Sequence, residues 1–330
     1  MKFGGLKVLV TGADGFIGSH LVERLVLDGA EVRAMCLYNS QGSWGWLEDT
    51  EHHVQNSIDV RLGDIRDPEW MVEACRGVDV VIHLAALIAI PYSYIAPRSF
   101  VDTNITGTIN VLEAARRNDV KRVIHTSTSE VYGTPRELPI RETHPLNAQS
   151  PYAATKLAAD QLAISYHLSF GVPVAILRPF NTYGPRQSTR AVIPAMMTQL
   201  LAGRREIQLG RLDTRRDLCF VTDTVDGFIR AITADKIIGE TTQLGTNTSP
   251  SIEQVFKAAC KVLGTDARVV LDERRLRPDQ SEVLVLEGDP TKAYERLGWK
   301  PTIGLEEGLR RTVVWLDRHL DLYKVDFLYA

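Results

Sequence analysis

The stretch KVLVTGADGFIGSH, residues 7–20, decides the fold of this chain. Its first part is apolar throughout, like a buried strand, and its second part begins an amphipathic helix. The turn between them contains Gly12, Gly15 and Gly18, with Phe16 and Ile17 inside the motif. Glycines let the backbone turn tightly and approach a pyrophosphate, and the helix N-terminus presents free N–H donors. In this context the motif predicts a dinucleotide site; the alternative is a tight strand–helix turn without a ligand.

The alternation of short apolar runs and helical segments continues through the first two-thirds of the chain. Runs that are apolar throughout, rather than at every second residue, are typical of parallel strands covered on both faces. The pattern predicts an α/β fold with a doubly wound parallel sheet, the Rossmann arrangement. The expected strands are residues 7–12, 31–37, 59–64, 79–86, 121–127 and 172–179, and the main expected helices are residues 16–29, 97–118, 151–170 and 304–320.

The pattern loosens into loops, helices and short strands beyond about residue 180. We therefore expect a dinucleotide-binding domain over residues 1–180. A smaller C-terminal lobe that binds the substrate is expected over residues 181–330, with some of its segments returning to the sheet. In a doubly wound sheet, ligands bind at the carboxyl ends of the strands.

The composition is that of a soluble globular protein and excludes several classes of partner. The 330 residues are 44% hydrophobic and 24% charged, and the net charge is −3, so neither a nucleic-acid nor a membrane-binding basic patch is expected. No run has the length of a membrane span, and the N-terminus lacks a secretion signal. Scattered cysteines and histidines indicate a reduced, cytoplasmic protein without a metal site. The cysteines are Cys36, Cys75, Cys219 and Cys260.

Two further stretches bear on the cofactor. In GDIRD, residues 63–67, Asp64 is suited to accept from the adenine amino group and Ile65 to pack on the ring. The alternative for Asp64 is to cap the helix that starts at Pro68. The second strand is followed by Asn39 and Ser40, where an acid would indicate NAD and an arginine NADP. Neither is present, so the second strand leaves the choice between NAD and NADP open.

A tyrosine and a lysine form the predicted catalytic pair. In SPYAATK, Tyr152 and Lys156 are four residues apart, so both lie on one face of a helix. A free phenol titrates near pH 10. An adjacent ammonium is expected to lower this pKa, so that the phenolate takes the proton of a sugar hydroxyl while hydride leaves the carbon. The alternative is an exposed helix pair without chemistry.

Taken together, these motifs resemble the extended short-chain dehydrogenase/reductase family over essentially the whole chain. The shared motifs are TGxxGxxG, GDIRD, HLAA, NITGTINVLEAA, YxxxK and RPFNTYGPRQ. Within the family, TSTSEVYG (residues 126–133) followed by SPYAATK resembles nucleotide-sugar 4,6-dehydratases. The nearest group is the NDP-N-acetylglucosamine 4,6-dehydratases of the legionaminic-acid pathway, which implies a UDP- or GDP-N-acetylglucosamine substrate and a tightly bound NAD, with NADP as the alternative.

The resemblance implies a role for each residue of TSTSEVYG. Thr128 would hydrogen-bond the sugar 4-hydroxyl beside Tyr152, and hydride would leave C4. Glu130 would then remove the C5 proton, water would leave from C6, and the hydride would return to C6. The glucose-type dehydratases have an aspartate general acid where this chain has Ser129, so water or protonated Glu130 would supply the proton here. The alternative is a Ser/Thr-rich strand end capped by local hydrogen bonds.

The resemblance also implies binding residues. Asn181, Arg216 and Arg277 would hold the substrate diphosphate, since guanidinium groups fit phosphate oxygens; the alternative for each arginine is a solvated surface position. Asn104 would steady the active-site backbone. A homodimer through the helices near 97–118 and 151–170 is expected. The implied cofactor-binding residues are Gly12, Gly15, Phe16, Ile17, Gly18, Asn39, Ser40, Asp64, Ile65, Leu84, Ala85, Ala86, Thr126, Tyr152, Lys156 and Pro179.

Three other functions compete with the dehydratase. UDP-glucuronate decarboxylases share TSTSEVYG, but they tend to have an arginine just before the catalytic tyrosine, where this chain has LNAQSPY. Simple 4-epimerases of the family do not need a carboxylate base at the position of Glu130. A dinucleotide-binding sensor or scaffold would be expected to lose Tyr152 or Lys156, and this chain keeps both.

Overall fold

A seven-stranded sheet forms the centre of the computed structural model, which describes residues 2–325. All neighbouring strands are parallel, in the order β11-β6-β5-β4-β1-β2-β3. The strands are β1 (Lys7–Thr11), β2 (Glu31–Leu37), β3 (Ile58–Gly63), β4 (Val80–His83), β5 (Arg122–Thr126), β6 (Val174–Pro179) and β11 (Thr241–Leu244). The doubly wound parallel sheet predicted from the apolar runs is confirmed.

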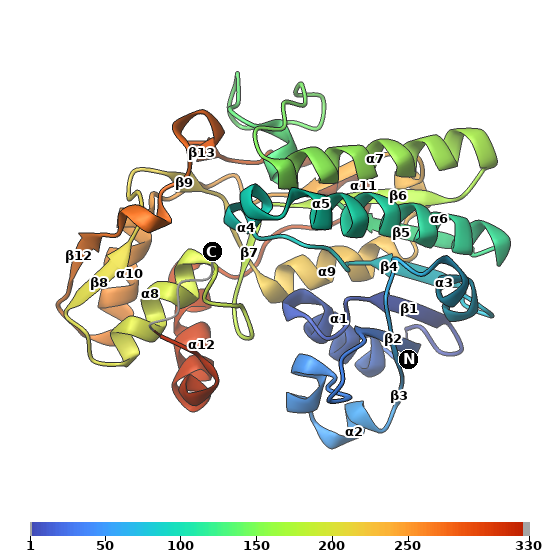
Figure 1. The fold of residues 1–330 in the computed structure, drawn as a ribbon, viewed down its shortest axis with the longest axis horizontal. Helices are drawn as coiled ribbons and strands as arrows, with labels where there is room; N and C mark the ends of the chain where they lie inside the picture. The colour runs from blue at the N-terminus through green and yellow to red at the C-terminus, as the bar shows by residue number, and fades with distance from the viewer. Residues whose placement is uncertain (1, 326–330) are drawn as a thin grey trace.

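Helices cover both faces of this sheet (Figure 1). Helices α3 (Pro68–Ala74), α6 (Gly107–Arg117) and α7 (Pro151–Phe170) lie on one face, and α1 (Phe16–Leu27) and α9 (Val221–Ala231) lie on the other. Successive residues of each strand point to opposite faces. In β1, Leu9 joins the core under α3 and α6, whereas Val8 and Val10 join the core under α1 and α9. Because both faces are buried, the strand is apolar throughout.

The strand order places a ligand site at one edge of the sheet. The chain leaves β1 toward β2 and β3, and then crosses back to β4 on the other side of β1. Ligands of doubly wound sheets bind where the strand order changes direction in this way, at the carboxyl ends of the strands. The cofactor and catalytic residues predicted from the sequence lie at or after the carboxyl ends of β1 to β6, or on α7 in the case of Tyr152 and Lys156, so the fold brings them to this edge.

The C-terminal part of the chain contributes both to the sheet and to a group of elements beside it. Strand β11 and helix α9 belong to the central body, while α8, α10, α12, β8 and β12 lie together on the left of Figure 1. Three two-stranded parallel pairs complete this part. Its elements are β7 (Asn181–Tyr183), α8 (Val192–Leu201), β8 (Glu206–Leu209), β9 (Arg215–Arg216), β10 (Leu218–Phe220), α10 (Ile252–Leu263), β12 (Arg268–Leu271), β13 (Val285–Leu286), α11 (Thr291–Leu297) and α12 (Leu305–Arg318).

Element boundaries differ from the sequence-based expectation in two places that matter for the site. Strand β4 ends at His83, so the remainder of HLAA is loop. The expected helix 97–118 consists of α5 (Pro97–Phe100), the π-helical segment η2 (Val101–Thr106) and α6. The remaining short helices are η1 (Gly45–Asp49), α2 (His52–Gln55), α4 (Ile90–Ile95), η3 (Ser129–Tyr132), η4 (Asp235–Ile237), η5 (Glu273–Arg275), η6 (Asp279–Ser281) and η7 (Leu320–Leu322).

Among residues 2–325, none of the helices is both long and apolar enough to cross a bilayer. Within the same range, no three or more His, Cys, Asp or Glu side chains are grouped so that they would hold a metal ion.

Candidate active site

The glycine turn after β1 forms a cradle that excludes side chains. Gly12 has φ +71°, and a Cβ on it would lie 2.8 Å from the Ala85 nitrogen. A Cβ on Gly18 would lie 2.1 Å from the Gly12 oxygen. Gly15 is the N-cap of α1 and supplies no side-chain cap, so Phe16 and Ile17 begin a helix whose first N–H groups are available to an anion. This geometry fits a dinucleotide pyrophosphate.

The loop after β4 closes over this cradle. The Leu84 N–H donates to the Thr11 carbonyl, and the Ala85 N–H donates to Thr11 Oγ1, both at 3.2 Å. Ala86 continues this loop and, like its neighbours, is half-buried. On the strands beside it, Thr126 ends β5 with a buried Oγ1 that has no hydrogen-bond partner, and the buried Pro179 ends β6. An unpartnered buried hydroxyl is a free position for a polar group of a ligand.

The structure excludes one of the two interpretations of Asp64. Helix α3 is capped by Asp67, which accepts from the Glu69 and Trp70 N–H groups, so the capping interpretation of Asp64 is wrong. Asp64 instead accepts from Arg66 Nε, and this hydrogen bond lowers the pKa of the Asp64 carboxyl. Ile65 is buried; a Cβ on Gly107 would lie 2.5 Å from its Cδ1.

The loop after β2 is held by its own side chains. Asn39 donates to the Leu37 and Ser43 carbonyls, and its Oδ1 accepts from the Gln41 and Ser43 N–H groups. Ser40 is exposed at the tip of this loop. The Asn39 side chain therefore fixes the shape of the loop, and the Asn39 backbone and Ser40 remain available to contact a ligand.

The predicted catalytic pair meets the TSTSEVYG segment. Ser150 caps α7 by accepting from the Ala153 N–H, which places Tyr152 in the first turn. The Tyr152 hydroxyl hydrogen-bonds the side chain of Thr128, which is the N-cap of η3. Tyr152, Thr128 and Lys156 are all buried. The two hydroxyls and the ammonium therefore come from two segments that meet at the carboxyl end of β5.

Burial controls the ionisation of this pair. It raises the pKa of Tyr152, and the charges of Glu130 and Asp160 raise it further, while the hydrogen bond from Thr128 lowers it. The prediction that Lys156 lowers the pKa of Tyr152 below its usual value is therefore wrong for this structure, because burial outweighs the other effects. For Lys156, burial lowers the pKa to about 8, and the charge of Asp160 opposes this shift.

Asn104, in the π-helical segment η2, ties the loops of the site together. Its Oδ1 accepts from the Leu87 N–H at 2.9 Å, and its Nδ2 donates to the Leu87 carbonyl at 2.9 Å and to Thr155 Oγ1 at 3.1 Å. The predicted role of Asn104 in steadying the backbone is confirmed, since these bonds connect the loop after β4 to α7 beside Lys156.

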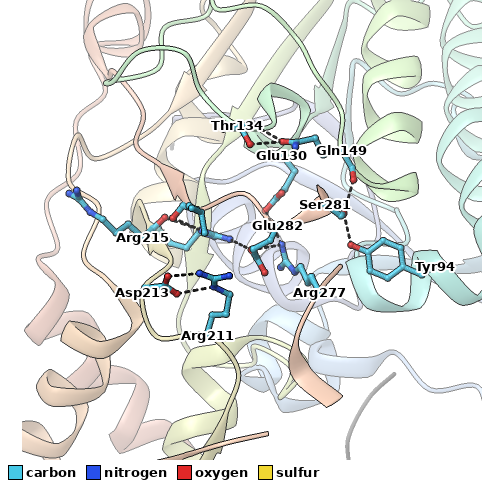
Figure 2. Close-up of polar contacts among 12 residues, drawn as sticks. Tyr94, Glu130, Thr134, Gln149, Arg211, Asp213, Arg215, Arg277, Ser281 and Glu282 are labelled. Carbon is cyan, nitrogen blue, oxygen red and sulfur yellow. Dashed lines mark hydrogen bonds and ion pairs between the residues drawn. The ribbon is translucent and has the colours of Figure 1, made fainter. Parts of the chain in front are cut away.

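A chain of alternating charges extends from the TSTSEVYG segment into the C-terminal part (Figure 2). Glu130 Oε1 lies 4.0 Å from Arg277 Nη1, and Arg277 Nη1 lies 3.6 Å from Glu282 Oε1. Glu282 Oε1 also lies 3.0 Å from Arg216 Nη2. The structure therefore brings together Glu130 and both arginines predicted to bind phosphate, although they are far apart in sequence. Ser129 is buried at the start of η3 beside Glu130.

Hydrogen bonds fix the segment that carries Arg277 and Glu282 against the central body. Ser281 Oγ lies 2.7 Å from the Tyr94 hydroxyl and donates to the Gln149 carbonyl at 2.6 Å. Gln149 Nε2 donates to the Gln280 carbonyl at 3.0 Å. Asn181, the third residue predicted to bind the diphosphate, has a buried Nδ2 without a hydrogen-bond partner.

Sequence reasoning missed Glu282 and a buried carboxylate, Asp160. Glu282 stands five residues after Arg277, and its side chain is 8% exposed between two arginines. Asp160 follows Lys156 by four residues and therefore faces the same side of α7. That i, i+4 spacing was the available signal, because a carboxylate on the buried face of a helix needs partners.

The cradle, the Tyr–Lys pair and the two arginines together define a dinucleotide-dependent enzyme of the extended short-chain dehydrogenase/reductase class that acts on nucleotide sugars. Comparison with known proteins agrees with this class. The family model described as GDP-mannose 4,6 dehydratase matches residues 9–312. The chain belongs to this family.

The relatives include dehydratases and epimerases at comparable similarity. A dTDP-glucose 4,6-dehydratase of Actinoplanes sp. is 34% identical over 319 residues, covering 94% of this chain and 97% of the relative. A UDP-glucose 4-epimerase of Mycolicibacterium smegmatis is 35% identical over 316 residues, covering 93% and 97%. The crystal structure of the Streptomyces venezuelae dTDP-glucose 4,6-dehydratase DesIV, solved with NAD bound, matches with a TM-score of 0.87 at 30% identity and covers 97% of this chain and 99% of that one.

Proposed function

We propose that this protein is an NAD-dependent nucleotide-sugar 4,6-dehydratase that acts on UDP- or GDP-N-acetylglucosamine. The observation that carries the proposal is the position of Glu130, whose carboxylate lies close enough to the Tyr152 hydroxyl to raise its pKa and follows Thr128 by two residues. A 4,6-elimination needs a base at C5 beside the group that oxidises C4. Simple 4-epimerisation does not need that base.

The residues of the glycine cradle would hold NAD. Support for NAD rather than NADP comes from the DesIV structure and from the segment 38–43, which contains no arginine or lysine for a 2′-phosphate. When bound, NAD supplies a hydride acceptor at C4 and a hydride donor at C6. The domain division of the proposal follows from this: residues 1–180 bind the cofactor, and residues 181–330 mainly bind the nucleotide sugar.

Tyr152, Thr128 and Lys156 act in the first step. Thr128 orients the sugar 4-hydroxyl through its own hydroxyl, and Tyr152 accepts the 4-hydroxyl proton. Lys156 stabilises the phenolate by its positive charge. Because these groups are buried, solvent screens their interactions little.

Glu130 acts in the second step. The C4 ketone acidifies the C5 proton, Glu130 removes it, and water leaves from C6. With Ser129 in place of an aspartate, we assign the proton for the departing hydroxide to protonated Glu130 itself. Glu130 would take the C5 proton and deliver it to the leaving oxygen, which departs as water. The proton that C5 regains when hydride returns to C6 would come from solvent, and Tyr152 would release the 4-hydroxyl proton to solvent, so that both side chains end the cycle as they began it.

The substrate diphosphate would bind to Arg216, Arg277 and the free Nδ2 of Asn181. In the structure Glu282 forms ion pairs with both arginines. A diphosphate would therefore replace or share these ion pairs, and guanidinium groups suit such bidentate contacts.

The proposal is tested by incubating the holoenzyme separately with UDP-N-acetylglucosamine, GDP-N-acetylglucosamine and UDP-glucuronate and following the products by mass spectrometry. Loss of water from one N-acetylglucosamine nucleotide is the expected result. Loss of carbon dioxide from UDP-glucuronate would assign Glu130 to a decarboxylase. A product of unchanged mass but altered chromatographic retention would indicate a 4-epimerase, and no reaction with any of the three would contradict the proposal.

We also propose that the protein is a homodimer that pairs through the helices around α6 and α7. Large apolar side chains are exposed on this side: Leu168 (76%) and Phe170 (58%) end α7, and Val101 (43%) lies in the segment that leads into α6. Exposed apolar side chains of this kind favour a protein interface. Sedimentation at micromolar concentration is expected to give a dimer, and a monomer alone would contradict it.

A further inference from the structure

A fully buried carboxylate, Asp160, lies under the catalytic pair and has no part in the proposed chemistry. Its Oδ2 accepts from Ser127 Oγ at 2.5 Å and from Arg178 Nη2 at 2.8 Å. Arg178 Nε also donates to Ser127 Oγ at 3.1 Å. Asp160 therefore joins α7 to β6 and to the residue that directly precedes Thr128.

The second oxygen of Asp160 faces a histidine. Asp160 Oδ1 lies 3.2 Å from His125 Nε2, and both side chains are at most 2% exposed. Neither ring nitrogen of His125 has a hydrogen-bond partner of good geometry. Burial lowers the pKa of His125, so the ring is neutral near pH 7, and Arg178 is the cation that compensates Asp160.

The remaining ionisable neighbours of Asp160 belong to the active site. The groups that face it are Tyr152 and Lys156 on α7, His125 on β5 with His83 of β4 behind it, Arg178 on β6 and Tyr132 in η3. Burial alone would raise the pKa of Asp160, but its hydrogen bonds and the charge of Arg178 hold it at about 2. The carboxylate is therefore ionised at every pH at which the enzyme is expected to work.

We propose that Asp160 is a positioning residue for C4 oxidation: it fixes the catalytic face of α7 against β5 and β6, and its negative charge holds Lys156 in the ammonium form. The inference rests on the proposed function only in assigning oxidation of a sugar hydroxyl to Tyr152 and Lys156. It holds equally for a dehydratase, an epimerase or a decarboxylase, because all three begin with that step.

The charge of Asp160 acts on both members of the pair in the same direction. It raises the pKa of Lys156 against the effect of burial, and it raises the pKa of Tyr152. Removing the charge lowers both values. The alkaline limb of the rate profile, where Lys156 loses its proton, then moves to lower pH. A residue that only supported the fold would lower the rate without displacing the profile.

The test uses Asp160→Asn in the NAD-loaded enzyme. The asparagine oxygen can still accept from Ser127 and Arg178, and its amide nitrogen takes the place of the oxygen that faces His125 Nε2, so the two hydrogen bonds of Asp160 remain while the charge is lost. The readout is the rate at which reduced nicotinamide absorbance appears after a nucleotide sugar is added, measured across pH. We use the sugar that turns over in the three-substrate assay, or UDP-glucose if none does. The expected result is a displacement of the profile by about one pH unit toward acid.

Three companion variants make the result decisive. Asp160→Glu keeps the charge and is expected to keep the position of the profile. Asp223→Asn neutralises another buried carboxylate, which lies in α9 on the face of the sheet opposite α7 (Figure 1) and accepts from the Thr302 and Ile303 N–H groups. This variant is expected to cost stability without moving the profile. Asp160→Asn leaves the buried charge of Arg178 without an opposite charge, which costs stability. If this variant does not fold, the double variant Asp160→Asn/Arg178→Gln, in which both side chains are neutral, takes its place.

The outcomes are distinct. A displaced profile in the neutral variants, with an unmoved profile in Asp160→Glu and Asp223→Asn, supports the proposal. A lower rate with an unmoved profile in the folded neutral variants overturns it and leaves Asp160 as a structural residue. If the dehydratase proposal alone is wrong, the wild-type enzyme still reduces its nicotinamide, but the three-substrate assay shows no loss of water from an N-acetylglucosamine nucleotide.

Discussion

At the scale of single residues, Glu130 is the group that, in the proposed mechanism, separates dehydration from simple 4-epimerisation. We expect Glu130→Gln to lower the rate of water loss by about 10²- to 10⁴-fold, the usual contribution of a general base. The glutamine cannot take the C5 proton, whereas Tyr152 and Lys156 still oxidise C4. Reduced nicotinamide should therefore accumulate in this variant when substrate is added, and absorbance spectroscopy measures it.

Glu137→Gln is the matched control for this prediction. Glu137 is exposed and follows Glu130 in the same connecting segment, so the same change of side chain is made away from the catalytic residues. It should leave turnover within twofold of the wild type. Equal losses in both variants would argue against a specific role for Glu130.

The pH dependence of the wild-type enzyme follows from Lys156. Burial lowers the pKa of this ammonium from 10.5 to about 8, so the positive charge is present below about pH 8 and is lost as the pH rises through it. Since the charged form stabilises the Tyr152 phenolate, kcat should fall on the alkaline side of about pH 8. A kcat profile that stays flat to pH 10 would show that Lys156 keeps its proton and would contradict the structure.

The site was predictable from the sequence where its residues stand in recognisable local patterns. Tyr152 and Lys156 share one helix face, and Thr128 and Glu130 share one strand end, so spacing alone places them. Glu282 and Asp160 were missed for different physical reasons. Glu282 owes its burial to arginines 5 and 66 residues away in the chain, and Asp160 owes its ionisation to a cation on β6.

At the scale of elements, the β1–α1 turn provides the most direct test of the cofactor cradle. We expect Gly18→Ala to destabilise the protein by about 1–3 kcal/mol, because the new Cβ would lie 2.1 Å from the Gly12 oxygen and the turn must shift. NAD binding should weaken as well, since the same turn approaches the pyrophosphate. Thermal unfolding with and without NAD measures both effects.

Gly4→Ala is the control for this turn. No heavy atom lies within 4 Å of a Cβ built there, so its effect should stay within about 0.5 kcal/mol. Unchanged NAD affinity in Gly18→Ala would exclude the cradle as the cofactor site.

The elements that were predicted correctly are those that residues close together in the sequence are enough to mark. The runs that became β1, β2, β5 and β6 are rich in consecutive apolar residues, and the glycines between β1 and α1 mark the turn between these two elements. The return of β11 to the sheet was expected only in general terms, because β11 pairs with β6 across more than 60 residues. The π-helical segment around Asn104 was not anticipated, since its geometry depends on the Asn104 contacts with Leu87 and Thr155.

At the scale of the whole molecule, the bound cofactor should increase the free energy of unfolding. NAD that binds the native state at 100 times its Kd would add about 2.7 kcal/mol. In a chain of this size we expect its removal to lower Tm by about 4 °C. Differential scanning fluorimetry of the stripped and NAD-loaded protein measures this shift, and identical Tm values would contradict a tightly held cofactor.

The site itself is a property of the whole molecule. Glu130 comes from the central body, whereas Arg277 and Glu282 come from the C-terminal part, and Figure 2 shows these three side chains together. Arg216, also from the C-terminal part, pairs with Glu282. Charge alternates across that junction, so in the proposed binding mode an anionic nucleotide sugar would exchange these ion pairs for its own. Binding of the diphosphate would then change the surroundings of Glu130.

The path of a single deuterium atom tests the proposed 4,6-dehydratase activity most directly. UDP- and GDP-N-acetylglucosamine labelled with deuterium at C4 would be incubated separately with the NAD-loaded enzyme, and the products analysed by mass spectrometry and NMR. If the enzyme is a 4,6-dehydratase, one of the two substrates should lose water, and its product should carry the deuterium at C6, because the hydride taken from C4 returns to C6 after elimination. Deuterium that stays at C4 without loss of water in both substrates would contradict it.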